Sequence, residues 1–413
     1  MPSACAASRP ENAPVKLRWM LSLDLHKTTY EALVREFELQ HPEIDIEVLW
    51  VPANQYPVKF RILAAAGQTP DLFYCGDVWA AAMRPFMRDL SPWIERDAAE
   101  IDLADFPDRL LEACRVEGRW YYLPWSFNVS LLYFNRSLFE AAGEPPPSPE
   151  WTWDDYLAAA QRLTQHRADG RTAQWGTDIL LGWWGEWLTL VRQSGGTLFT
   201  PDIDRCVLDT PEAVRALSFY SDKVRRWRIA PPPGFGPAAG FAARNLAMQW
   251  GGHTGKWAIY NATPDLDWDI EVLPKGPAGR AGGELAVEAY ALSNTCAHPE
   301  AAWTFLKFVS SRDGLRPFVA RGNVPVRWSL AREFFEAPDR TVRPANWRAL
   351  YRALEGAQPT PQTPDFIEVV LEIIQPEIDL MIEGRQTPAE TAARASRAAD
   401  AFISTLGARR PAP

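Results

Sequence analysis

Apolar residues in the first hundred positions follow two alternating periods. Some runs are short and continuous or repeat every second residue, which predicts β-strands, and others repeat every three to four residues, which predicts helices. The predicted elements are, in order, a strand at 17–23, a helix at 30–41, a strand at 44–48, a helix at 58–66, a strand at 71–75 and a helix at 78–90. This alternation predicts a mainly parallel sheet wrapped by helices.

The following residues repeat the alternation and predict a second α/β unit with its own core. Its expected elements are a strand at 131–134, a helix from Thr152, a helix from Thr210, and strands at 246–250 and 268–273 around a short helix at 254–260. Thr152 and Asp155 have the spacing of a helix capping box. A further strand past residue 286, a helix at 299–310 and a helix-rich tail at 346–406 follow. A helical tail does not fold without partners, so we expect it to pack back onto the earlier units.

Composition and charge exclude several classes of function. The 413-residue chain carries 52 acidic and 43 basic side chains, a net charge of −9, and has no stripe of Lys and Arg, so it is not expected to bind nucleic acid. No apolar stretch reaches the length of a membrane span. The absence of a Gly-x-Ser-x-Gly elbow and of a phosphate loop removes the commonest hydrolase and NTPase interpretations. The 19 Trp exceed what a core requires.

The cysteines predict no metal site. Cys5, Cys75, Cys114, Cys206 and Cys296 include no CxxC pair and no His at metal-ligand spacing. Four of them could pair in an oxidising compartment, whereas scattered buried thiols are the simpler interpretation. Cys5 follows two small residues, as does the lipidated cysteine of a bacterial lipoprotein. One hypothesis is therefore that Cys5 is lipidated, and the alternative is an ordinary N-terminal tail.

Seven short segments carry a family resemblance through their order along the chain. They are Ala-Ala-Ala-Gly-Gln-Thr-Pro-Asp-Leu at 64–72, Asp-Leu-Ser-Pro at 89–92, Tyr-Leu-Pro-Trp at 122–125 with Leu-Tyr-Phe-Asn at 132–135, Trp-Thr-Trp-Asp-Asp at 151–155, Ala-Met at 247–248 with Gly-Gly at 251–252, the segment 289–293 with His-Pro-Glu-Ala-Ala at 298–302, and Gly-Arg-Gln-Thr-Pro at 384–388. In this order they resemble the bacterial extracellular solute-binding proteins of the maltose-binding type, which deliver sugars to ABC importers.

The resemblance implies an α/β fold of the type II periplasmic-binding class. In this fold, also called a Venus flytrap, two discontinuous lobes close on a ligand, and here a helical C-terminal segment completes it. A tail at 1–14 would precede lobe one, at 15–125 and 291–326, and lobe two, at 131–287 and 335–413. The implied hinge crossings lie near 125–131, 287–291 and 324–330.

The resemblance also implies the function. The chain would be the non-enzymatic, extracytoplasmic component of an ABC importer that binds a mono- or short oligosaccharide between the lobes and delivers it to permease subunits. No cofactor is expected, and we expect a periplasmic or extracellular monomer, with lipid anchoring as an option at Cys5.

Sugar recognition requires aromatic faces for C–H surfaces and polar side chains for hydroxyls. Such residues follow the predicted strands and the implied hinges. The candidate ligand-binding residues are Asp24, His26, Asp77, Trp79, Trp125, Phe127, Asn128, Trp183, Trp184, Glu186, Trp250, Gly252, His253, Glu288, Tyr290, Asn323 and Arg327. Trp250 and Tyr290 are the foremost candidates, because the family places a sugar-stacking aromatic near each position.

Several of these residues have a structural alternative. Asp77 and His253 could cap helices, Trp79 could belong to the core, and one of Trp183 and Trp184 is expected to face away from a ligand. Two other functions also stay open. A cationic or zwitterionic solute such as a glycerophosphodiester could bind between Trp faces and carboxylates, and a glycoside hydrolase would use two carboxyl groups across a cleft.

Overall fold

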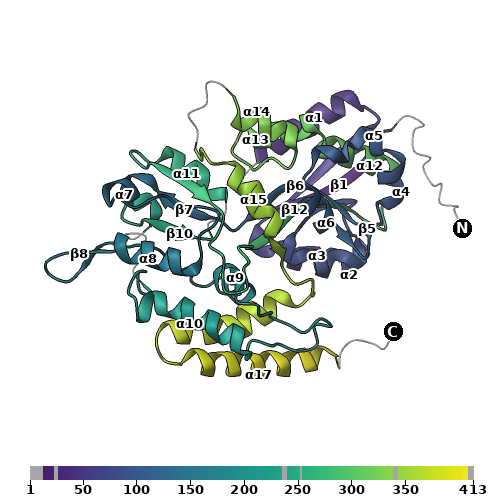
Figure 1. Ribbon diagram of the computed structural model, residues 1–413. Helices are drawn as coiled ribbons and strands as arrows, with labels where there is room; N and C mark the ends of the chain where they lie inside the picture. The colour runs from purple at the N-terminus through teal and green to yellow at the C-terminus, as the bar shows by residue number, and fades with distance from the viewer. Residues whose placement is uncertain (1–12, 23–26, 235–239, 252–253, 338–342, 408–413) are drawn as a thin grey trace, which may run out of the picture. The chain divides into compact units, whose positions relative to one another are not determined.

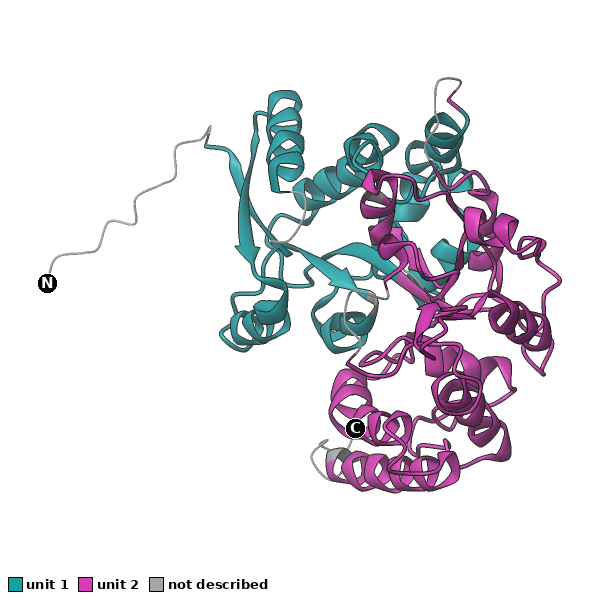
Figure 2. Ribbon diagram, turned by 90° about the vertical axis from the view of Figure 1, so that its left-hand side faces the viewer, with its two compact units in different colours: residues 1–127, 287–336 teal, residues 128–286, 337–413 magenta. Residues whose placement is uncertain are grey.

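The computed structural model describes residues 13–22, 27–234, 240–251, 254–337 and 343–407. The chain forms two compact units, shown in different colours in Figure 2. Unit 1 comprises Met1–Phe127 and Val287–Glu336, and unit 2 comprises Asn128–Ala286 and Ala337–Pro413. The chain therefore passes from one unit to the other three times. The third passage follows Glu336, later than the segment 324–330 that the sequence suggested.

A mixed sheet forms the centre of unit 1. Its strands are β1 (Val15–Ser22), β2 (Ile44–Val51), β3 (Leu72–Gly76), β6 (Tyr122–Val129) and β12 (Glu284–Leu292), the last of which also pairs with the short β13 (Gln358–Pro359) of unit 2. Strand β1 lies between β2 and β3 and is parallel to both, as the sequence pattern predicted. Strand β12 adds to the other side of β3 in the antiparallel direction.

Helices cover this sheet (Figure 1). They are α1 (Lys27–Gln40), α2 (Tyr56–Ala65), α3 (Asp77–Met83), α4 (Ser91–Arg96), α5 (Ala98–Ile101), α6 (Asp108–Ala113), α12 (Pro299–Ser310), α13 (Arg312–Val319) and α14 (Trp328–Phe335), with a hairpin of β4 (Arg115–Val116) and β5 (Arg119–Trp120). The helix predicted at 78–90 was too long. It stops at Met83 and is followed by a 3-10 turn at Arg84–Phe86, because Pro85 lacks the amide hydrogen that would continue the helix.

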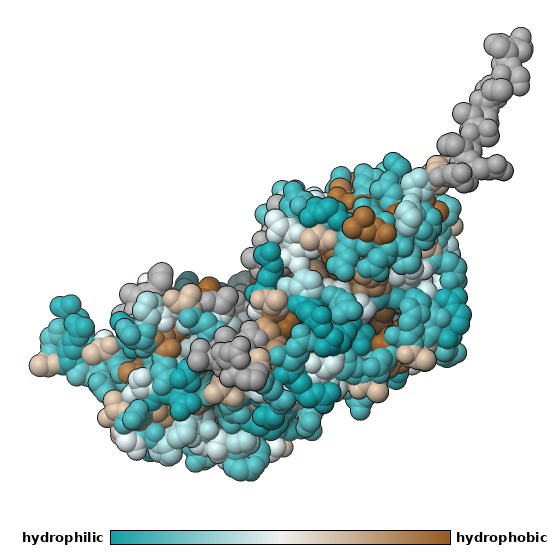
Figure 3. All heavy atoms as spheres, turned by 90° about the horizontal axis from the view of Figure 1, so that it is seen from above, coloured by the Kyte–Doolittle hydropathy of each residue, from teal (hydrophilic) through white to brown (hydrophobic). Residues whose placement is uncertain are grey.

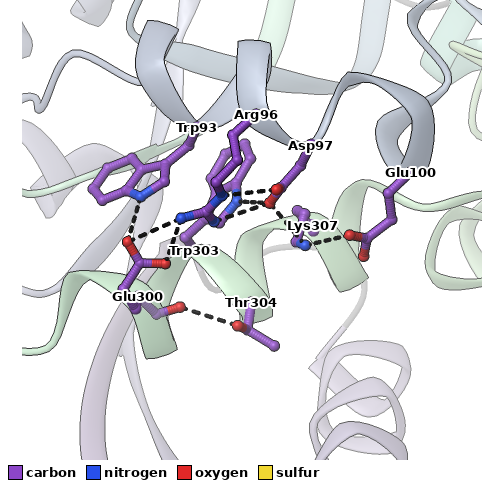
Figure 4. Close-up of polar contacts among 8 residues, drawn as sticks. All are labelled: Trp93, Arg96, Asp97, Glu100, Glu300, Trp303, Thr304 and Lys307. Atoms are coloured by element: carbon purple, nitrogen blue, oxygen red, sulfur yellow. Dashed lines mark hydrogen bonds and ion pairs between the residues drawn. The ribbon is translucent and has the colours of Figure 1, made fainter.

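A polar network joins α4 and α5 to α12 within unit 1 (Figure 4). The indole of Trp303 donates to Asp97 at 2.7 Å and that of Trp93 to Glu300 at 2.6 Å, and the two rings stack with centroids 5.9 Å apart. Arg96 donates to both carboxylates. The hydrogen bonds from Arg96 and Trp303 hold the pKa of Asp97 well below its usual range. These tryptophans thus stabilise helix packing.

Unit 2 has a three-stranded antiparallel sheet in which β7 lies between β10 and β11. Its elements are β7 (Leu132–Asn135), α7 (Arg136–Ala141), α8 (Trp153–Leu163), β8 (Gln165–His166), β9 (Thr172–Gln174), α9 (Gly185–Gln193), α10 (Pro211–Arg225), β10 (Met248–Trp250), α11 (Trp257–Ala262), β11 (Trp268–Glu271), α15 (Arg348–Gly356), the π-helix η7 (Glu368–Ile374), α16 (Gln375–Ile382) and α17 (Pro388–Gly407). The capping box at Thr152 and Asp155 is present. Helix α17 packs on α10 and α16 (Figure 1), so the helical tail joins unit 2.

The face shown in Figure 3 is mainly hydrophilic, with small separate apolar areas. The most exposed large apolar side chains among the described residues are Leu39, Val58, Ile62, Leu181 and Ile259. None of the described helices combines the length and the hydropathy that crossing a bilayer requires. Four cysteines in the described part of the chain are free and buried, and Cys5 lies outside it. The described residues include no cluster of metal-binding side chains.

We predict that Gly282→Ala lowers the free energy of unfolding of this protein by about 3 kcal/mol. A Cβ atom at residue 282 would lie 1.8 Å from the carbonyl oxygen of Gly356, so backbone would have to move. Gly356→Ala is the matched control, because its Cβ would come no closer than 3.5 Å to Gly282. The control should change stability by less than about 1 kcal/mol. Urea unfolding measures both, and equal effects would contradict the packing described.

Candidate functional site

The parallel strands of unit 1 end on the same edge of the sheet, where ligands usually bind in α/β folds. Asp24 and His26 follow β1 but lie outside the described residues. Asp77 is the first residue of α3, and its side chain is also outside the described part. Trp79 is half-buried, stacks on Tyr56 with centroids 5.4 Å apart, and meets the edge of Tyr74 at 5.8 Å.

Trp125 and Tyr290 form a stacked pair in unit 1. Their ring centroids are 5.8 Å apart and their planes differ by 13°. Tyr290 is buried and its hydroxyl shares a 2.7 Å hydrogen bond with Tyr30. Burial raises the pKa of Tyr290 well above its usual value, so this hydroxyl stays neutral. Trp125 is half-buried, and its Nε1 has no hydrogen-bond partner among the described residues.

Glu288 lies two residues before Tyr290 on β12 and therefore on the same face of the sheet. The hydroxyl of Tyr74 donates to its carboxylate. The strand register places Glu288 opposite Gly76 and Tyr290 opposite Tyr74. A Cβ on Gly76 would lie 2.6 Å from the Tyr74 hydroxyl oxygen, so glycine leaves room for this contact.

Together these residues form what we call the unit 1 aromatic site. It consists of Tyr74, Trp79, Trp125, Glu288 and Tyr290, joined through the contacts of Tyr74 and Tyr290. The site contains two half-buried indoles, a half-buried carboxylate and an indole N–H without a partner among the described residues. The nitrogen atom of Trp125 is itself buried, so the exposed part of the indole ring and the carboxylate of Glu288 are what this site offers a ligand.

A second aromatic group lies in unit 2, and we call it the unit 2 tryptophan pair. Trp183 and Trp184 stack with centroids 3.6 Å apart. Both indoles point to Glu284, whose carboxylate accepts from Trp184 at 2.8 Å and from Trp183 at 3.5 Å. Trp184 is only 1% exposed, whereas Trp183 is half-buried. Trp183 is thus the member of the pair with surface to offer a ligand.

Two further candidates are half-buried in their own units. The side-chain oxygen of Asn128 accepts a 2.7 Å hydrogen bond from the hydroxyl of Thr254 in unit 2. Asn323 belongs to the turn after α13 in unit 1, where its backbone N–H bonds to Phe318. Gly252 and His253 lie outside the described residues.

Four candidates occupy the interior of their own unit, contrary to the position expected of a ligand contact. Phe127 is fully buried. Trp250 is 1% exposed and meets Tyr156 edge-on at 5.2 Å, so its ring faces are covered. Glu186 forms a wholly buried ion pair with Lys223. None of these three offers a free polar or aromatic face in this structure.

Arg327 is the fourth interior candidate. It is 4% exposed, donates to the carbonyls of Ser310 at 2.9 Å and Ile101 at 3.0 Å, and forms an ion pair with Asp105 at 3.4 Å. Its guanidinium therefore joins α5 to the end of α12. The sequence could not reveal this role, because these partners come from distant segments.

Tyr30, Tyr74 and Glu284 also belong to these two groups of contacts, and the sequence pattern did not indicate them. Tyr30 has the helical spacing of a core residue, and Tyr74 is the middle residue of a short buried strand. Glu284 begins β12 and is 4% exposed. A carboxylate at the start of a strand whose other residues, apart from Glu288, are Ala, Val, Leu and Tyr was the one signal that could have indicated a buried hydrogen-bonding role.

Residues 24–315 match the family model of the bacterial extracellular solute-binding proteins. The chain belongs to this family. This solute-binding protein is therefore a binding protein and not an enzyme, which removes the glycoside hydrolase alternative.

Two relatives named for the compounds they bind are distant from this chain in sequence. An arabinooligosaccharide-binding protein of Halalkalibacterium halodurans is 23% identical, with 74% of this chain and 70% of the relative covered. A mannitol-binding protein of Pseudomonas aeruginosa is 25% identical, with 69% and 68% covered.

Solved structures confirm the predicted type II periplasmic-binding fold. The sugar-binding protein MalE of Xanthomonas citri superposes with a TM-score of 0.80 at 19% identity, covering 96% of this chain and 99% of the other. A cyclic α-maltosyl-1,6-maltose binding protein of Arthrobacter globiformis gives a TM-score of 0.78 at 22% identity, covering 95% and 100%.

We predict that Arg327→Lys lowers the free energy of unfolding by about 2–3 kcal/mol, because an ammonium group cannot reproduce the forked hydrogen bonds of a guanidinium. Arg332→Lys, at an exposed position on α14, is the control and should change stability by less than about 0.5 kcal/mol. Urea unfolding provides the comparison. If Arg327→Lys leaves stability unchanged, the structural role of Arg327 is wrong and a ligand contact is again the better interpretation.

Proposed function

We propose that this protein is the extracytoplasmic substrate-binding component of an ABC importer and that its ligand is a mono- or short oligosaccharide. Its membership of the solute-binding family supports the transport role. The names of relatives that bind arabinooligosaccharide and mannitol support a neutral, hydroxyl-rich ligand.

The unit 1 aromatic site is the observation that carries the proposal. The exposed part of Trp125 provides an apolar surface for the C–H face of a sugar ring, and stacking on Tyr290 fixes its orientation. Glu288 provides a carboxylate that accepts hydrogen bonds from sugar hydroxyls. Stacking surface and acceptor together match the chemistry of a sugar.

The unit 2 tryptophan pair offers a second surface of the same kind. Glu284 fixes both indoles, so the ring of Trp183 is held in one orientation before any ligand arrives. A preorganised ring loses little entropy on binding. In this proposal the ligand contacts Trp125 and Glu288 of unit 1 and Trp183 of unit 2, and closure of the two units on it produces the form that a permease recognises.

Location and assembly belong to the same proposal. The family description is extracellular, which agrees with an extracytoplasmic position. Lipidation of Cys5, which lies outside the described residues, and a monomeric state stay predictions. Mass spectrometry of the protein from its native membrane would test the lipid.

A zwitterionic ligand with a cationic head is the alternative, and one structural observation weighs against it. That alternative relied on Asp24, Asp77, Glu186 and Glu288 around tryptophan faces. The carboxylate of Glu186 is already neutralised by Lys223 in the interior of unit 2. A cationic head would therefore find fewer carboxylates than the sequence suggested.

We expect calorimetry to detect binding of a neutral sugar or polyol in a panel of maltose, maltotriose, an arabinose trisaccharide, mannitol, erythritol and glycerophosphocholine. The affinity for a neutral ligand should change little between low and high salt, because no net charge is paired on binding. Binding of glycerophosphocholine alone, weakened by salt, would establish the alternative. Binding of no compound in the panel would contradict the proposed ligand class.

We further predict that Trp125→Ala and Trp183→Ala each weaken binding of the panel ligand about tenfold or more, because each removes a stacking face. Trp93→Ala and Trp227→Ala are matched controls, since both indoles are half-buried, one in each unit, outside the two aromatic groups. The controls should leave affinity within about twofold of the unmodified protein. Equal effects of site and control variants would refute the assigned surfaces.

A further inference from the structure

The segment 178–184 carries the unit 2 tryptophan pair and has no regular secondary structure of its own. It connects β9 to α9, and Gly182 in it has a φ of 70°, which favours glycine. Leu181 and Gly182 are exposed, and Trp183 is half-buried. A loop of this composition needs outside contacts to keep one conformation.

Those contacts come from side chains inside unit 2. The backbone N–H of Leu180 donates to the carboxylate of Glu186 at 2.6 Å, and the carbonyl of Leu180 accepts from the hydroxyl of Tyr220. At the start of the segment, the carboxylate of Asp178 accepts from the backbone N–H of Trp250 at 2.9 Å. Both backbone groups of Leu180 are therefore fixed by side chains of α9 and α10.

The carboxylate that holds Leu180 is itself held by a buried ammonium. Lys223 donates to the other oxygen of Glu186, and both side chains are 0% exposed. Burial opposes the charge on Lys223, but Glu186, Tyr156 and Asp178 together outweigh burial and raise the pKa of the amine, which stays protonated. Its Nζ also lies 5.8 Å from the ring centroids of Tyr156 and Trp250.

An ion pair in the interior is expensive, and an apolar pair of similar volume often gives equal or greater stability. Stability alone therefore does not account for Lys223 and Glu186. The pair does supply something that apolar side chains cannot, namely an oriented acceptor for the N–H of Leu180, three residues before Trp183.

We propose that Lys223 and Glu186 are positioning residues, which fix the segment 178–184 so that Trp183 is presented to the ligand in one orientation. Lys223 orients Glu186, Glu186 holds the backbone of Leu180, and Glu284 accepts from the indole N–H of Trp183. The inference rests on the proposed function in one respect, that Trp183 contacts the ligand.

Two double variants differ in whether residue 186 keeps an acceptor for the N–H of Leu180. Lys223→Met with Glu186→Leu removes both charges and the acceptor of the Leu180 N–H. Lys223→Met with Glu186→Gln also removes both charges but keeps an amide oxygen for that N–H. Neither leaves one half of the Lys223 and Glu186 ion pair alone. The carboxylate of Asp178, which Lys223 also attracts, keeps its hydrogen bond from the backbone N–H of Trp250, so both variants are expected to fold. Tyr220→Phe is an additional variant that removes only the donor to the Leu180 carbonyl.

Hydrogen exchange without any ligand is the first measurement. In the Leu variant, peptides that cover 178–184 should exchange about tenfold faster than in the unmodified protein, because a buried hydrogen bond is lost. The Gln variant should stay close to the unmodified rate, and peptides from α17 should be unchanged in both. Equal exchange of 178–184 in the two double variants overturns the proposal. If either double variant fails to fold, faster exchange in Tyr220→Phe supports the fixed segment and an unchanged rate overturns it.

Calorimetry with maltose, or with the panel compound that binds the unmodified protein, is the second measurement. The Leu variant should bind about tenfold more weakly, and the Gln variant should bind with nearly normal affinity. If residues 178–184 exchange faster in the Leu variant but its affinity for the ligand is unchanged, the claim that the segment presents Trp183 to the ligand is wrong. If no panel compound binds, the proposed ligand class fails, and the exchange experiment still decides whether Lys223 and Glu186 fix the segment.

Discussion

The pairing of β12 with β3 is the interaction on which the unit 1 aromatic site depends. Its register sets Glu288 opposite Gly76 and Tyr290 opposite Tyr74, which brings a carboxylate and a stacking ring to one face. A shift by one residue would turn these side chains to the other face of the sheet. The same strand begins with Glu284, which holds the tryptophan pair of unit 2. One strand thus supplies polar anchors to both units.

Side-chain carboxylates and amides hold several of the tryptophans by accepting hydrogen bonds from their indole N–H groups. Buried indoles need a partner for their N–H, and this chain provides one at many positions. Trp184 donates to Glu284, Trp303 to Asp97 and Trp187 to Gln375. Most of these rings are therefore structural. Trp125 and Trp183 differ because part of each ring is left uncovered, which is what a sugar-binding surface requires.

Two buried cations, Arg327 and Lys223, have different roles. Arg327 and Lys223 both lie in the interior, yet their surroundings differ. Arg327 donates hydrogen bonds to backbone carbonyls at the ends of two helices and so joins these helices. Lys223 pairs with a carboxylate that in turn binds a loop next to Trp183. A buried ion pair of the second kind defines a conformation more than it adds free energy.

Local patterns in the sequence determined most of the elements and the family. Periodicity located β1, β2, β3 and the helix at 299–310, and the Thr152 and Asp155 spacing gave a true capping box, because these signals depend on neighbours in sequence. Tertiary structure decided which candidate side chains are left for a ligand. Lys223 and Glu186 are 37 residues apart, Arg327 and Asp105 222, and Tyr290 and Tyr30 260. Only folding brings such partners together, so burial and pairing of a polar or aromatic side chain cannot be derived from its local sequence.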